Sequence, residues 1–131
     1  MRDELRRMQL WEYLWCAVRN GRLPPVRFVE LALSRAGAER CDLTLSRLAD
    51  RLRIVIDRLL GAAQQQHSVP QLESLAWGVL RSSRRHDVRR VWLRALIGWT
   101  RTSEGFASLH ALLAADRDDL RFADRFAVAG A

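Results

Sequence analysis

The chain of 131 residues contains no lysine, so all 22 of its basic residues are arginines. It also has a single asparagine, Asn20, and only three isoleucines, at positions 54, 56 and 97. Avoidance of these three residue types together is typical of a GC-rich genome, which shapes composition independently of function. The net charge of +7 is therefore weaker evidence for a nucleic-acid partner than it is in a protein with ordinary codon usage.

Cysteine, proline and glycine are also scarce. The two cysteines, Cys16 and Cys41, exclude a disulfide scaffold and lack the spacing of zinc ligands. We expect both to be reduced, with Cys16 packing as a small hydrophobic residue within a helix. Three prolines, seven glycines and few β-branched residues argue against an all-β fold and favour helices.

Long hydrophobic runs are missing as well. The mixed-charge start Met1-Arg2-Asp3-Glu4 is unlike a signal peptide, and no segment approaches the length of a membrane span. We therefore expect a cytoplasmic protein without a membrane partner. Because 49% of the residues are hydrophobic, a real core is possible. The length predicts that residues 1–131 form one domain or a piece of a larger one, and the composition favours a single helical domain.

Apolar residues recur at helical spacing along most of the chain. The pattern predicts helices over residues 4–19, 25–35 and 43–60, and further helices that begin at Ser68, Asp87, Ser103 and Asp118 or Asp119. The low-complexity stretch 62–67, Ala-Ala-Gln-Gln-Gln-His, is predicted to be a linker or a frayed helix end. Short connections imply antiparallel neighbours. The predicted fold is all-α, with stacked antiparallel helix pairs forming a HEAT-like α-solenoid segment of about seven helices.

Two apolar stripes define the predicted core. The stripe of the third helix is the longest, and it consists of Leu45, Leu48, Leu52, Val55, Ile56 and Leu59. The first helix contributes Leu5, Met8, Trp11, Trp15 and Val18 at the same kind of spacing.

No pattern of catalytic residues emerges. The sequence lacks a zinc-protease motif, a phosphate-binding glycine loop and a nucleophile elbow. None of the three histidines, His67, His86 and His110, has a second ligand at metal-binding spacing. The acidic cluster Asp116, Asp118, Asp119 and Asp124 lacks the alternating ligands and glycine turn of a calcium loop, so we interpret it as capping and pairing with nearby arginines. We assign no catalytic, cofactor-binding or metal-binding residue.

One basic cluster has two competing interpretations. Between residues 81 and 94 there are six arginines and one acid, Asp87, and such a helix start can bind phosphates. Trp92 and Trp99 could then stack on bases. However, the two tryptophans are seven residues apart on one apolar face, which favours core packing beside a solvated arginine face. The candidate residues for binding an anion or a partner are Arg84, Arg85, Arg89 and Arg90.

Several segments, in order along the chain, resemble one family. Residues 10–15, Leu-Trp-Glu-Tyr-Leu-Trp, and residues 18–33, Val-Arg-Asn-Gly-Arg-Leu-Pro-Pro-Val-Arg-Phe-Val-Glu-Leu-Ala-Leu, resemble part of the C-terminal helical domain of aminopeptidase N of the actinobacterial type. Asp87 with residues 91–96, Val-Trp-Leu-Arg-Ala-Leu, is similar to the family's Gly-Ser-Asp turn and the helix after it. Residues 119–122, Asp-Leu-Arg-Phe, resemble its Asp-Leu-Arg-Trp segment. Arg84-Arg85-His86 departs from the family's Pro-Gly-Ser turn, and Arg89-Arg90 from a Gln-Leu-like pair.

The resemblance implies a part of an enzyme and not the whole of one. Complete members are zinc aminopeptidases, in which His-Glu-x-x-His and a downstream Glu hold zinc and Gly-x-Met-Glu-Asn recognises the free amine of a peptide. None of these motifs is present, so this chain has no means of activating a zinc-bound water. In the family, the helical domain forms a lid over the catalytic chamber. The resemblance therefore implies a non-catalytic lid segment whose partners are a catalytic domain or the peptide substrate.

Two functions compete on these observations. The first is the lid segment, which on its own has no hydrolase activity and no cofactor. The alternative is a stand-alone arginine-rich helical module that binds nucleic acid or an acidic protein, of which nucleic acid is the less favoured because the basic charge has a compositional origin. An enzyme with unrecognised chemistry ranks third, since no nucleophile or acid–base pair is apparent.

Overall fold

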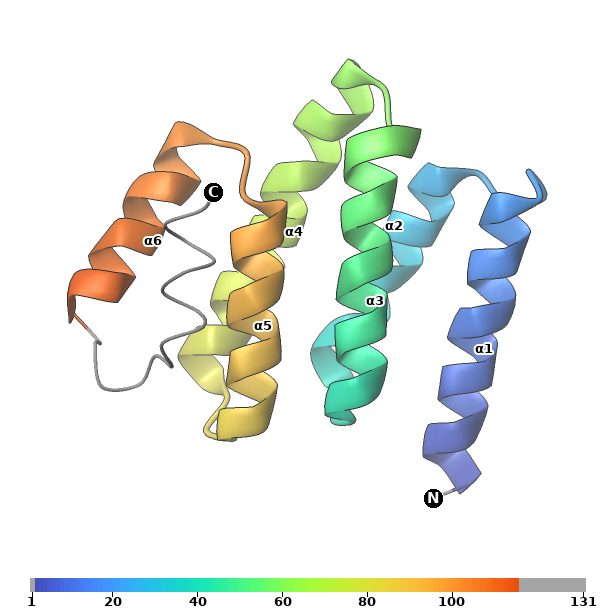
Figure 1. Cartoon of the computed structure of the whole chain (residues 1–131), viewed down its shortest axis with the longest axis horizontal. Helices are drawn as coiled ribbons and strands as arrows, with labels where there is room; N and C mark the ends of the chain where they lie inside the picture. Colours follow the sequence, from blue (N-terminus) through green and yellow to red (C-terminus); the bar gives the residue numbers. More distant parts are fainter. Residues whose placement is uncertain (1, 116–131) are drawn as a thin grey trace.

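The computed structural model describes residues 2–115, and every regular element within them is a helix (Figure 1). The six α-helices are α1 (Arg2–Arg19), α2 (Pro25–Arg35), α3 (Asp42–Ile54), α4 (Ala62–Ser82), α5 (His86–Trp99) and α6 (Ser103–Ala115). A 3₁₀ turn, Ala36–Ala38, follows α2, and a π-helical turn, Val55–Leu59, follows α3. The all-α prediction is confirmed for this part of the chain. The seventh helix, predicted to start at Asp118 or Asp119, lies outside the described residues.

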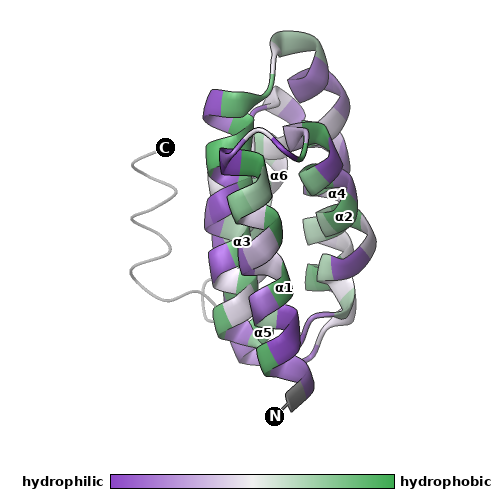
Figure 2. Cartoon of the chain, turned by 90° about the vertical axis from the view of Figure 1, so that its right-hand side faces the viewer, coloured by the Kyte–Doolittle hydropathy of each residue, from purple (hydrophilic) through white to green (hydrophobic). Residues whose placement is uncertain are grey.

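The helices alternate between two layers. In Figure 1, α1, α3 and α5 lie side by side at the front, while α2 and α4 lie behind them, and consecutive helices run in opposite directions. Figure 2 shows the two layers from the side. The most extensive packing joins α5 to α4 and α3, and α2 packs directly against α4 within the rear layer. Helix α6 stands at the end of the stack and lacks a comparable contact with α4.

The turn between α1 and α2 follows from its sequence. Gly21 adopts a φ of 73°, a left-handed conformation that glycine tolerates without strain. The amide of Arg22 then donates to the carbonyl of Ala17 at 2.8 Å, which closes the end of α1. Pro25 occupies the first turn of α2, where its missing N–H is no loss. This helix boundary was predictable, because each residue has one dominant local preference.

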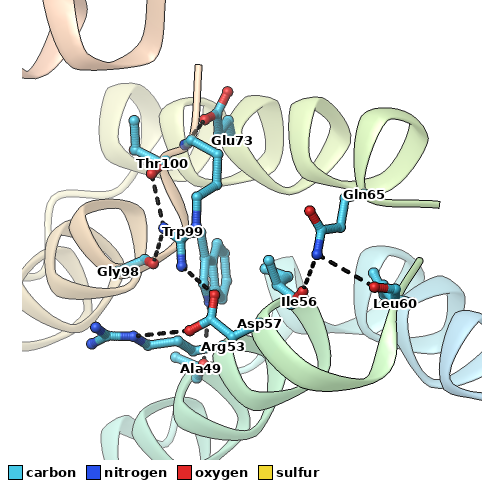
Figure 3. A network of polar contacts seen from close by, with 11 residues as sticks. Ala49, Arg53, Ile56, Asp57, Leu60, Gln65, Glu73, Gly98, Trp99 and Thr100 are labelled. Atoms are coloured by element: carbon cyan, nitrogen blue, oxygen red, sulfur yellow. Dashed lines mark hydrogen bonds and ion pairs between the residues drawn. The ribbon is translucent and has the colours of Figure 1, made fainter. Parts of the chain in front are cut away.

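Of the two interpretations of residues 62–67, the linker is wrong, because these residues form the regular first turns at the N-terminal end of α4. Two glutamine side chains explain the difference. Gln64 Oε1 accepts a hydrogen bond from the Gly61 amide at 3.1 Å and so satisfies the helix start. Gln65 Nε2 donates to the carbonyl of Ile56 at 2.7 Å and to that of Leu60 at 3.3 Å, which ties α4 to the π-helical turn (Figure 3). Pro70 consequently lies inside α4 rather than in its first turn.

The core lies between the two layers, and most of the predicted stripes are confirmed. Leu45, Leu48, Leu52, Val55 and Ile56 are all at most 3% exposed. Helix α5 supplies the largest set of buried side chains, which comprises Val88, Trp92, Leu93, Ala95, Leu96, Ile97 and Trp99. Helix α5 is therefore the central helix of the hydrophobic core.

Three residues expected in the interior are at the surface instead. Leu5 is 54% exposed because the first turns of α1 extend beyond the neighbouring helices, and Leu59 is 42% exposed because the π-helical turn rotates it away from the stripe. Cys16 is also exposed, so it does not pack as a hydrophobic residue. It and the partly buried Cys41 are both free thiols.

Ion pairs join α1 to the segment that follows the 3₁₀ turn and to α3. Arg7 makes a bidentate contact with Glu39, at 2.9 and 3.1 Å, across the end of the 3₁₀ turn. Burial raises the pKa of Glu39, but hydrogen bonds from Arg7 and the Cys41 amide outweigh it and hold the pKa below its usual value. Arg51 pairs with Glu12 at 2.7 Å and lies over the ring of Trp15 at 5.6 Å.

No helix among residues 2–115 is long and apolar enough to cross a membrane.

Candidate binding site

The four candidate arginines lie together at one end of the α4–α5 helix pair. Arg84 and Arg85 are in the short loop that follows α4, and Arg89 and Arg90 are in the first turns of α5. The loop is at the lower end of α5 in Figure 1. The sequence thus identified residues that are neighbours in the fold, although their side chains have different contacts.

Arg85 is bound to the start of its own helix. Its guanidinium donates to Asp87 Oδ2 at 2.8 Å, while Asp87 Oδ1 accepts from the Val88 amide at 2.9 Å. The hydrogen bond from Arg85, followed by that from the Val88 amide, lowers the pKa of Asp87. Asp87 therefore remains ionised at neutral pH and neutralises much of the charge of Arg85.

Arg89 and Arg90 turn towards the body of the protein. Arg89 Nη1 donates to the carbonyls of Leu80 and Ser83, so it caps the C-terminal end of α4, where a cation also interacts favourably with the helix dipole. Arg90 is half-buried, and its Nε is enclosed without a hydrogen-bond partner. Arg84 is exposed and forms no ion pair with a carboxylate of residues 2–115. The cluster is thus partly structural and partly open to solvent.

Trp92 and Trp99 are core residues. Each is 2% exposed, and their rings meet edge to face with centroids 6.0 Å apart. Trp99 Nε1 donates to the carbonyl of Ala49 in α3 at 3.1 Å, which joins α5 to α3 (Figure 3). Neither ring is available to stack on a base, so the interpretation of these residues as core is confirmed.

A groove with a volume of about 780 Å³ runs between α4 and α6. One wall carries Pro70, Ser74, Trp77 and Arg81 of α4, and the other carries Glu104, Ser108, Ala111 and Leu112 of α6. Arg89, one of the four candidate arginines, lines the same groove. This feature was not predicted, because it depends on how far α6 stands from α4.

Glu73 holds the base of this groove together. It is 8% exposed, and its carboxylate accepts hydrogen bonds from the Arg101 amide at 3.1 Å and from Thr102 Oγ1 at 3.2 Å. Thr102 Oγ1 in turn accepts from the Gly105 amide at 2.9 Å, which caps the start of α6. A side chain on α4 therefore fixes the turn that positions α6. No sequence signal indicated this partnership, since residues 73 and 102 are remote in the chain.

Arg101 adds a second connection at the same turn. Its guanidinium donates to Asp57 Oδ1 at 2.6 Å and to the carbonyls of Gly98 and Thr100 at 2.7 and 2.8 Å. Arg53 approaches the other carboxylate oxygen of Asp57 at 3.9 Å. The C-terminal end of α5 is thus attached to the π-helical turn.

The three histidines are all exposed or partly exposed and lie on different helices: His67 on α4, His86 at the start of α5 and His110 on α6. Within residues 2–115 there is no group of three or more His, Cys, Asp or Glu residues that could hold a metal ion. The acidic cluster at residues 116–124 lies outside the described residues.

Comparison of the chain with models of protein families, with curated proteins and with solved structures gives no match.

Proposed function

We propose that the chain is a non-catalytic helical lid segment, similar to part of the C-terminal domain of aminopeptidase N, that acts together with a zinc-peptidase catalytic domain. In this proposal the two-layered stack is a HEAT-like α-solenoid, it shapes or covers a peptide chamber, and it works in the cytoplasm. Zinc and the hydrolytic groups belong to the partner domain.

The observation that supports this proposal most strongly is the apolar character of the end of the stack. On α1, Leu5 and Leu10 are each 54% exposed and Tyr13 is 71% exposed, although no other described helix covers them. Stacked helical repeats bury such faces against the next repeat or against another domain. At the opposite end, α6 has one charged residue, Glu104, and Phe106 is 39% exposed. Both ends therefore present surface suited to further protein.

The segment resemblance supplies the second line of support. The Trp-rich segment, the Gly21 turn and the Leu-Pro-Pro segment coincide with the α1–α2 hairpin, and Asp87 with residues 91–96 coincides with α5. The resembling segments thus coincide with α1, α2 and α5, in the order in which the family has them.

The first test is catalytic. The purified chain, assayed with and without added zinc, should not hydrolyse aminoacyl-nitroanilides, because it offers no ligand set for the metal within residues 2–115. Zinc-dependent turnover that stays with the chain through purification would overturn the proposal.

The second test is docking. The chain should bind an actinobacterial-type aminopeptidase N from which the late helices have been deleted, and binding should alter how the rate depends on peptide length. Leu10→Asp and Tyr13→Asp place charges on the exposed face of α1 and should weaken the complex, whereas Gln71→Asp, at an exposed site on α4, should not. Absence of binding, or equal loss in all three variants, would refute the lid function.

A stand-alone binding module is the second candidate, and exposed arginines favour it. Arg81 and Arg84 flank the end of α4 and form no ion pair with any carboxylate in the described part of the chain. Binding of an acidic protein that falls steeply with salt, in the absence of any peptidase partner, would favour this candidate over the lid.

A further inference from the structure

We propose that the groove between α4 and α6 binds an amphipathic helix of a partner protein, with the carboxylates of that helix placed at the Arg81–Arg89 end. This proposal goes beyond the lid function and does not depend on it, because it concerns a different surface from the exposed face of α1.

The shape of the groove suits a helix. Pro70, Ser74, Trp77 and Arg81 follow one another at intervals of four, three and four residues, so they form one straight face of α4. On α6, Ser108 and Ala111 are small, and they let a neighbouring backbone approach closely. From Pro70 to Arg81 the rise along α4 is about 16 Å, which matches roughly three turns of a bound helix.

The arrangement of the helices in two layers indicates where a bound helix would lie. Helix α2 packs directly against α4 in the rear layer, whereas α6, among the described residues, makes no comparable contact with α4 and borders the groove instead. A helix in the groove would therefore lie beside α4 and extend that layer. The half-buried side chains of Trp77 and Leu112 would form the apolar contact, as in other complexes in which an amphipathic helix occupies a groove.

The charges of the lining residues favour an acidic end on the bound helix. Arg81 and Arg89 lie at one end of the groove, and Glu73 and Glu104 lie at the other, about 12 Å away along α4 by the helical rise between residues 73 and 81. Arg89 is already held by the carbonyls of Leu80 and Ser83, so little side-chain entropy is lost when it meets a carboxylate. The net charge of +7 also attracts an acidic partner from a distance.

The test uses designed peptides as probes and the full chain as the receptor. The first probe is a fluorescent, alanine-rich helical peptide of about 14 residues, with leucines at every third and fourth position and glutamates in one terminal turn. The second replaces the glutamates by lysines, and the third replaces the leucines by serines. Fluorescence anisotropy at low and at physiological salt measures each affinity.

We expect the first peptide to bind at least about tenfold more tightly than either of the others, because only it satisfies both the apolar face and the arginines. Arg81→Glu should weaken binding by at least about tenfold through like-charge repulsion. Arg58→Glu, at an exposed site on the π-helical turn, is the matched control and should have a smaller effect.

A second pair of variants tests the location. Ala111 and Ala114 are both exposed on α6, but only Ala111 lines the groove. Ala111→Trp fills the groove and should abolish binding, whereas Ala114→Trp should leave it intact. Circular dichroism of both variants checks that the fold is kept.

Three results would overturn the proposal. The first is no measurable binding of the leucine–glutamate peptide, and the second is equal binding by the Ala111→Trp and Ala114→Trp proteins. The third is tight binding of a single-stranded oligonucleotide that Arg81→Glu abolishes and Ala111→Trp does not affect, because this would assign the arginines to nucleic acid instead of a helix.

Discussion

Replacement of each of the two buried tryptophans of α5 by phenylalanine should have unequal effects. Trp92 and Trp99 are equally buried, at 2% exposure, and their rings are in contact. They differ at the indole nitrogen, since Trp99 Nε1 donates to the Ala49 carbonyl at 3.1 Å while Trp92 Nε1 is buried without a partner. Phenylalanine removes the N–H in both cases and leaves a similar loss of volume.

The magnitudes follow from that difference. The cavity cost is common to both variants, so it cancels when they are compared. Trp99→Phe loses a hydrogen bond with a net contribution of about 1 kcal/mol, whereas Trp92→Phe removes an unpaired donor whose burial costs about 1–3 kcal/mol. We therefore expect Trp99→Phe to be the less stable variant by about 2–4 kcal/mol.

Urea unfolding followed by far-ultraviolet circular dichroism provides the measurement, because that signal is dominated by the helical backbone. With a slope of about 1–3 kcal/mol per molar urea for a chain of this size, the two midpoints should differ by roughly 1 M or more. Equal midpoints, or a lower midpoint for Trp92→Phe, would refute the hydrogen-bond reasoning and the assignment of Trp99 to Ala49.

Two further predictions concern helix glycines and pH. A Cβ at Gly78 would have no atom within 4 Å, so Gly78→Ala should stabilise the protein by about 1 kcal/mol through its higher helix propensity. A Cβ at Gly105 would lie 2.8 Å from Thr100 Cγ2. Gly105→Ala should therefore lose the same gain, because overpacking costs about 1–3 kcal/mol. Thermal melts of both variants check this, and equal upward shifts would contradict it. The folded-state pKa of Glu39 is lowered, so its contribution is complete above the unfolded value of about 4.3 and is lost as the pH falls through the lower folded value. Urea titrations between about pH 6 and pH 3, which bracket the unfolded value of about 4.3, should therefore show that the stability difference between wild type and Arg7→Gln shrinks with acidity. A constant difference would exclude the Arg7–Glu39 pair as its source.

Much of the fold was predictable because local preferences agree with the tertiary structure. The apolar spacing of Leu45, Leu48 and Leu52 has one interpretation, and the Asn20-Gly21 pair has a strong tendency to end a helix. The interpretation of residues 62–67 as a linker failed for a different reason. Gln64 and Gln65 stabilise α4 through bonds to the preceding turn, and a polar low-complexity stretch gives no sign of such contacts.

The candidate site was predictable only in part. A run of arginines identifies Arg84, Arg85, Arg89 and Arg90 as neighbours, but it does not show that Arg89 caps α4. The α4–α6 groove was unpredictable, since its width depends on the contact of Glu73 with a turn remote in sequence.

The polar contact at the start of α6 makes the far end of that helix sensitive to small changes. Among the residues of α6 whose burial the structure describes, the buried ones are Gly105 and Leu109, in its first two turns, and the remaining length of the helix extends along the groove. A helix of this length spans about 20 Å, so a rotation of about 10° at Thr102 displaces its far end by roughly 3 Å, which is comparable to the width of a methyl group. Helix α6 is therefore anchored at one end by Glu73 and Thr102, and substitutions of these two residues should change the groove along its whole length as well as at the end that they line.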